Sequence, residues 1–126
     1  MTLANTKLKV TGIDHVVLHV KDLDRSRRFY VDLLGFEVAH EGGSNSFLRC
    51  GSQLVALFER KDTDIHAGAE MNHMALRLEH GEYEEVKAIL EAEQIQVTGL
   101  PGDDHCIYFN DPDGHRLQLL TVREQH

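Results

Sequence analysis

The sequence contains no tryptophan, and its only two cysteines, Cys50 and Cys106, stand far apart. This spacing predicts no disulfide framework, and the absence of a Cys-x-x-Cys pair argues against a thiolate metal site or a redox centre. We therefore expect both cysteines to be half-buried strand thiols without a chemical role.

Long apolar runs are also missing. Neither a signal peptide nor a membrane span is predicted, and a cytoplasmic location is expected. With 13 basic against 21 acidic residues, the formal net charge is −8. Such a chain repels nucleic acid and anionic lipid, so we expect neither as a partner; a cationic or neutral small molecule fits better. The length suits a single domain over residues 1–126.

An internal repeat is present instead. Residues 13–20 and 71–78 both alternate apolar and polar side chains, as half-buried strands do. His15 and His73 occupy the same place in the two segments. Amphipathic helices are predicted next, at residues 24–34 and 82–92, and short strands follow each helix.

The repeat predicts an α+β fold built from two βαβββ modules. Module 1 covers about residues 11–59, a surface-exposed linker covers 60–70, and module 2 covers about residues 71–122. A single module leaves an exposed sheet edge, so we expect two of them to form a cupped, barrel-like mixed sheet with the helices outside.

Strand alternation predicts which side chains face the cup. His15 and His73 point away from the helix-covered face, and so does Gln118, because Leu117 and Leu119 take the core positions of the last strand. Imidazole and amide oxygen ligands suit Zn²⁺, Fe²⁺, Ni²⁺ or Mn²⁺. The sequence thus predicts a divalent-metal site at these three residues, with ordinary polar surface as the alternative.

Three parts of the sequence resemble the vicinal oxygen chelate superfamily: the histidine strands, residues 29–36 and, above all, residues 108–119. The last stretch reads Tyr108-Phe109-Asn110-Asp111-Pro112-Asp113-Gly114-His115-Arg116-Leu117-Gln118-Leu119. This superfamily includes glyoxalase I, fosfomycin-resistance enzymes, extradiol dioxygenases and bleomycin-resistance proteins. The resemblance covers about residues 12–122. It implies metal ligands at His15, at His73 and at a last-strand glutamate, which is Gln118 here.

The resemblance also implies further site residues. A first-module ligand position falls on Val55, which cannot bind a metal. Tyr108 matches a site tyrosine of the fosfomycin-type enzymes, so Tyr108 and Gln118 are the expected catalytic residues. Because an amide cannot act as a general base, ordinary glyoxalase I activity is not expected. The fosfomycin-type phosphonate loop is acidic here, at residues 99–104.

Several other residues carry expectations. His19 and Arg77 occupy equivalent rim positions and, together with Tyr108, are the predicted substrate-binding residues. Glu59 would replace the missing ligand only if the strand register slipped. Three histidines near predicted turns are expected to face solvent: His40, His105 and His115. Residues 111–114 (Asp-Pro-Asp-Gly) predict a structural type I turn.

Two functions follow as hypotheses. The first is a metal-dependent enzyme, of the lyase, isomerase, transferase or dioxygenase type, that acts on a small substrate with vicinal oxygens. The second is a metal-free binder like the bleomycin-resistance proteins, which the neutral residues Val55 and Gln118 favour. In either case a homodimer is expected. The resemblance implies that metal ligands often come from both subunits, and a site within one chain and a site shared by two both stay open.

Overall fold

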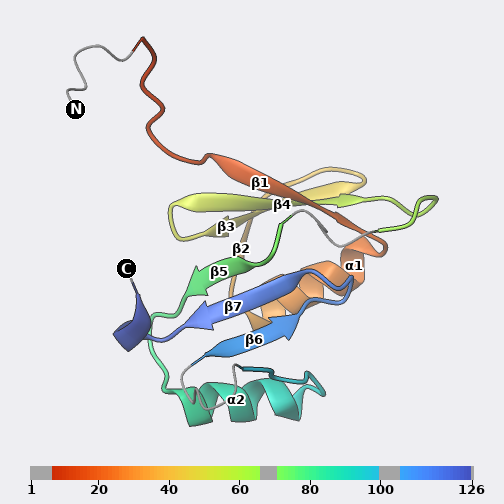
Figure 1. Ribbon diagram of the computed structural model, residues 1–126. Helices are drawn as coiled ribbons and strands as arrows, with labels where there is room; N and C mark the ends of the chain where they lie inside the picture. Colours follow the sequence, from red (N-terminus) through yellow and green to blue (C-terminus); the bar gives the residue numbers. More distant parts are fainter. Residues whose placement is uncertain (1–6, 66–70, 100–105, 126) are drawn as a thin grey trace.

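The structure is a computed structural model that describes residues 7–65, 71–99 and 106–125 (Figure 1). The first half contains, in order, β1 (His15–Val20), α1 (Leu23–Arg27), the π-helical segment η2 (Arg28–Leu33), β2 (Glu37–Glu41), β3 (Asn45–Cys50) and β4 (Gln53–Glu59). The second half contains β5 (Met74–Arg77), α2 (Tyr83–Ala92), β6 (Ile107–Asn110), β7 (Arg116–Leu120) and the short η3 (Val122–Glu124).

The strands form two separate mixed sheets. One has the order β1-β4-β3-β2 and the other has the order β5-β7-β6. In each sheet the first strand of the half pairs in parallel with the last, β1 with β4 and β5 with β7. The α+β class and the repeated βα start are confirmed, while the described sheets do not close into a barrel (Figure 1).

The second sheet is smaller than the sequence predicts. The strand expected at residues 96–98 is reduced to one bridge, in which Thr98 and Tyr108 exchange backbone hydrogen bonds of 2.8 and 2.9 Å. The residues that continue the chain beyond this bridge, including His105 and most of the acidic loop 99–104, lie outside the described residues. The predicted linker 60–70 is exposed over residues 60–64, and its residues 66–70 also lie outside the description.

The helix expected at residues 24–34 is two elements. The Asp22 side chain caps α1 by accepting a hydrogen bond of 3.1 Å from the Arg25 amide. The chain then widens into η2, where the Leu34 amide reaches back five residues to the Phe29 carbonyl. Gly35, at φ 83°, ends the segment with a backbone conformation that L side chains rarely adopt.

The second helix matches its prediction closely. Glu82 and Glu85 form a reciprocal capping box at its start. Val86 and Leu90 are buried as expected, but Ile89 is 55% exposed, because it faces a groove between the two halves rather than a sheet. No helix in the described part of the chain is long and apolar enough to cross a membrane.

One hydrophobic cluster draws on both halves. It includes Leu18 and Val20 of β1 together with Leu117 and Leu119 of β7, as strand alternation predicts. Both cysteines are half-buried and stand outside any disulfide, as expected. The side chains on the other face of each sheet are therefore left to build a site.

Candidate functional site

The second sheet brings three of the predicted site residues onto one face. β7 lies between β5 and β6, and its Gln118 is paired with Ala75 on one side and with Tyr108 on the other. His73 stands directly before β5, in line with this face. The ring of Tyr108 lies 5.3 Å from the ring of His73, at an angle of 87°. The predicted association of His73, Tyr108 and Gln118 thus has a geometric basis.

Gln118 occupies an unusual position for a polar residue. It is only 9% exposed, and its amide has no hydrogen-bond partner among the described residues. The Gln118 amide is nevertheless not among the fully buried side-chain atoms that lack a partner in the described residues, so its remaining exposure lies at the amide on the open face. The amide oxygen of Gln118 is therefore available to bind a ligand on the open face.

Arg116 also lies in this cluster, although the sequence analysis assigns it no role. Its guanidinium carbon lies 4.2 Å from the centroid of the Tyr108 ring. The signal was present in the sequence, because a residue two positions before Gln118 on a strand shares its face.

The first sheet carries His15 among aromatic rings. The His15 ring lies 5.4 Å from Phe47, which also lies 6.0 Å from Phe58. His40, exposed as predicted, is 6.3 Å from the same ring. His15 therefore faces an apolar open surface, which suits a ligand with a nonpolar part.

The two repeat-related histidines have the same local support. Nδ1 of His15 lies 2.8 Å from Oδ2 of Asp14, and Nδ1 of His73 lies 2.8 Å from Oδ1 of Asn72. With Nδ1–H donated to the preceding side chain, Nε2 keeps its lone pair. Metal-binding histidines are commonly oriented by a second hydrogen bond of this kind.

A complete metal site is not present within one chain. His15 and His73 belong to separate sheets, and no group of three or more His, Cys, Asp or Glu side chains that could hold a metal occurs in residues 7–65, 71–99 and 106–125. Any ion bound by both histidines would need the two faces to meet.

The predicted first-module position is shifted by one residue. In the second sheet Gln118 pairs with Ala75, whose counterpart in the first half is Val17. Val17 pairs with Ala56, so the residue that corresponds to Gln118 is Ala56 and not Val55. Val55 belongs to the core cluster instead. The β1–β4 register runs without a slip, and Glu59 accepts a hydrogen bond of 2.8 Å from the Leu23 amide at the start of α1. β4 thus supplies no carboxylate at the position that corresponds to Gln118.

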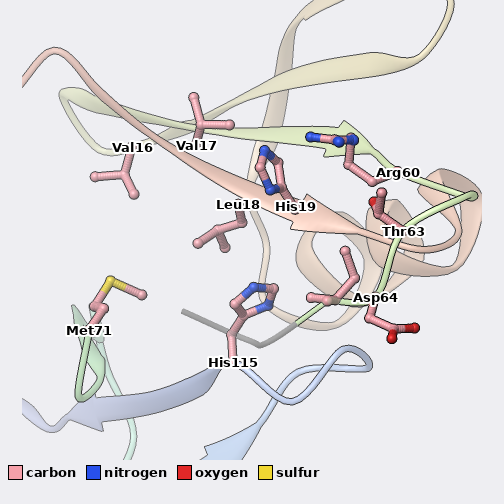
Figure 2. Close-up of a pocket in the computed structure, with 10 residues that line it drawn as sticks. Val16, Val17, Leu18, His19, Arg60, Thr63, Asp64, Met71 and His115 are labelled. Carbon is pink, nitrogen blue, oxygen red and sulfur yellow. The ribbon is translucent and has the colours of Figure 1, made fainter. Parts of the chain in front are cut away.

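His19 and Arg77 do not share a rim. His19 lines a cavity of about 460 Å³ beside β1, together with Arg60, Asp64 and His115 (Figure 2). Arg77 lines a different groove, of about 770 Å³, between the two halves. Their equivalence in the repeat therefore does not place them around one ligand within a chain.

His115 is buried, so the expectation that it faces solvent is wrong. It is 2% exposed, and its Nδ1 lies 2.7 Å from Oδ2 of Asp111. The same carboxylate oxygen accepts a hydrogen bond of 2.6 Å from the Tyr30 hydroxyl. The other oxygen accepts from the amides of Asp113 and His115, at 2.9 and 2.8 Å. The predicted turn at 111–114 is present, with the Gly114 amide donating to the Asp111 carbonyl.

This turn also joins the halves. The Asp113 carboxylate accepts hydrogen bonds from the Lys21 amide, Nη2 of Arg25 and Oγ of Ser26, at 3.0, 3.0 and 3.2 Å. Burial raises the pKa of Tyr30 well above its ordinary value, and the Asp111 charge adds to this. The turn is thus a buried polar junction and not only a reversal of the chain.

The pH dependence of the free energy of unfolding should show the contribution of the His115–Asp111 pair. Burial opposes the charged imidazole, but the hydrogen bond and charge of Asp111 outweigh it and raise the pKa of His115. The pair therefore stabilises the fold below the unfolded histidine pKa, and this contribution is lost as pH rises through the higher folded value. Urea unfolding should show a steeper loss of stability above about pH 6.5 in the native chain than in H115Q. H40Q, which changes an exposed histidine, is the control, and equal slopes in H115Q and the native chain would contradict the assignment.

The repeated βα units, the parallel pairing within each sheet and the equivalent histidines define a protein of paired-module α+β architecture. The chain belongs to the glyoxalase/bleomycin resistance protein/dioxygenase superfamily, whose family model matches residues 12–119. The resemblance to the vicinal oxygen chelate fold is thereby confirmed.

Similar proteins include metallothiol transferases. A metallothiol transferase FosB of Staphylococcus saprophyticus is 32% identical over 117 residues, which cover 89% of this chain and 78% of the relative. A FosB of Staphylococcus epidermidis is 28% identical and covers 90% of this chain and 84% of its own length. Among solved structures, a glyoxalase family protein from Enterococcus faecalis is 30% identical with a TM-score of 0.70, covering 86% of this chain and 95% of that one.

Proposed function

We propose that this protein is a divalent-metal-dependent enzyme that binds a small substrate through vicinal oxygens. The observation that carries the proposal is the matched pair His15 and His73, each with Nδ1 held by the preceding side chain. Similarity to metallothiol transferases supports a metal-dependent transferase in particular.

The residues present fit a metal. His15 and His73 would each offer Nε2, and Gln118 would offer its amide oxygen, which has no partner among the described residues. When bound, a divalent ion acts as a Lewis acid that stabilises developing negative charge on substrate oxygens. Zn²⁺, Fe²⁺, Ni²⁺ and Mn²⁺ all accept this nitrogen and oxygen set.

Gln118 decides which chemistry suits the site. An amide does not accept a proton at neutral pH, so this residue cannot remove a proton from carbon as a glutamate would. A transferase that joins a thiol to its substrate forms a sulfur–carbon bond as a carbon–oxygen bond breaks, and the thiol proton passes to the released oxygen, so no base has to take a proton from carbon. Tyr108 lies beside Gln118 and offers a hydroxyl to orient the substrate. Transfer or addition therefore fits better than isomerisation.

We further propose that two subunits share each site. His15 lies on the edge strand β1 of one sheet, and His73 adjoins the edge strand β5 of the other. Two copies can place the first sheet of one against the second sheet of the other, so that His15 of one subunit meets His73 and Gln118 of its partner. Such an isologous dimer contains two equivalent sites.

Metal binding tests the proposal directly. Protein purified without a His-tag and without added metal should hold about one equivalent of divalent metal per chain. The Q118E variant should bind Zn²⁺ at least about tenfold more tightly, because a carboxylate adds a charge to the ligand set. Competition with a fluorescent chelator measures both affinities.

A matched control uses Gln94, an exposed residue just after α2. Q94E adds the same charge away from the site and should leave the Zn²⁺ affinity unchanged. Equal affinities in Q118E, Q94E and the native protein would remove Gln118 from the ligand set.

A metal-free ligand-binding protein is the second candidate. It is favoured by Ala56 and Gln118, which place an apolar residue and a neutral amide at the two positions facing the cup. Absence of metal at any loading, with ligand binding retained in H15A and H73A, would support this function over the enzyme.

A further inference from the structure

The open face of the second sheet carries a cation that the metal ligands do not account for. Arg116 stacks on Tyr108, with 4.2 Å between its guanidinium carbon and the ring centroid. A guanidinium over an aromatic face is attracted by the ring electrons and held in a defined place. Because Tyr108 also contacts His73, this charge lies in the same cluster as a predicted metal ligand.

The local charge is opposite to that of the whole chain. β5, β6 and β7 contain no Asp or Glu, and of their two arginines Arg77 lines the separate groove between the halves, so Arg116 supplies the charge beside Tyr108 in a chain with a formal charge of −8. No carboxylate among the described residues pairs with Arg116. The expectation of a cationic or neutral ligand came from the net charge alone, whereas this face favours an anion.

Gln118 strengthens the same preference. A ligand set of two histidines and one amide is neutral, so a divalent ion would keep its full charge, whereas a glutamate would cancel part of it. Arg116 stands two residues before Gln118 on β7, so both side chains project from the same face. Metal and guanidinium charges would therefore act on one ligand together.

We propose that Arg116 is a specificity-determining residue that binds an anionic oxygen group of the substrate, such as a carboxylate, while Tyr108 positions the guanidinium. The inference rests on the proposed function for the neighbouring metal-bound oxygens. A planar guanidinium donates paired hydrogen bonds to a carboxylate, which a lysine cannot reproduce. The site thus selects small anionic chelators over neutral ones.

The test compares R116Q with R123Q. Arg123 is exposed in η3, outside the three strands, so R123Q removes the same charge away from this face. Zn²⁺ affinity is measured first, and the Zn²⁺-loaded proteins are then titrated with oxalate by calorimetry. We expect R116Q to bind oxalate at least about tenfold more weakly than the native protein, with R123Q within about twofold and Zn²⁺ affinity equal in all three. R116K should recover only part of the loss.

Each other outcome is decisive. Equal oxalate affinity in R116Q and R123Q overturns the inference and leaves the metal site in place. If the native protein binds no Zn²⁺, the proposed function fails instead, and oxalate is titrated into metal-free protein while the amide NMR signals of Ala75 and Gln118 are followed. Shifts that R116Q loses and R123Q keeps support the inference, whereas absent or equal shifts overturn it.

Discussion

Replacing Asp111 with alanine should lower the free energy of unfolding by about 3–5 kcal/mol, because it leaves a buried network without its central acceptor. Asp111 is 4% exposed, and its carboxylate accepts hydrogen bonds from the side chains of Tyr30 and His115 and from two backbone amides. Each donor would remain buried and unpaired in D111A, and unpaired buried donors are more unfavourable than lost contacts alone. Urea unfolding followed by circular dichroism measures the difference.

Two further variants make this prediction specific. D62A changes an exposed aspartate of the linker and should stay within about 0.5 kcal/mol of the native protein. Y30F removes only the hydroxyl that donates to Asp111 and should lose about 1.5–3 kcal/mol, as for a hydrogen bond to a charged group. A loss in D111A no larger than that in D62A would show that the network does not stabilise the fold.

The architecture was accessible from the sequence because it depends on local periodicity. The alternation around His15 and His73 gives a period of two, and this period alone assigns the core face and the open face of β1 and β5. Leu117 and Leu119 are buried and Gln118 lies on the opposite face for the same reason. The helix caps at Asp22 and Glu82 are likewise local signals.

The buried junction was not accessible, because its contacts are distant along the chain. Tyr30 and Asp111 are separated by 81 positions, so no window of sequence shows that the Tyr30 hydroxyl meets a carboxylate. His115 is a polar residue that follows a turn, and such residues are usually exposed. Only the packing of the first helical segment against this turn makes it a buried partner of Asp111.

The counterpart of Gln118 shows a different limit. The family resemblance implies Val55, which follows Gly51 by four residues as Gln118 follows Gly114, whereas the strand pairing selects Ala56. A difference of one residue moves a side chain to the other face of a strand, and turn alignment does not resolve it. Neither residue binds metal, so the ligand set that the sequence implied is unchanged.

Subunit sharing leads to the most discriminating expected result. H15A and H73A should each lose metal binding as homodimers, yet a heterodimer with one chain of each kind should recover about half of the native metal content. In a shared site, one of the two sites of this heterodimer loses both histidines and the other keeps both. If each chain instead built its own site, every site of the heterodimer would lack one histidine and no metal would be recovered.

The heterodimer is obtained by co-expression with two different affinity tags that bind no metal, followed by sequential purification. Metal content by mass spectrometry and oxalate binding by calorimetry are then measured on the same sample. A heterodimer of H15A with the native chain serves as the control and should also retain about half, because it too keeps one complete site. Zero recovery in the H15A/H73A pair beside half recovery in this control would assign both histidines to the same subunit and contradict the shared site. Failure of the two tagged chains to co-purify would contradict the dimer itself.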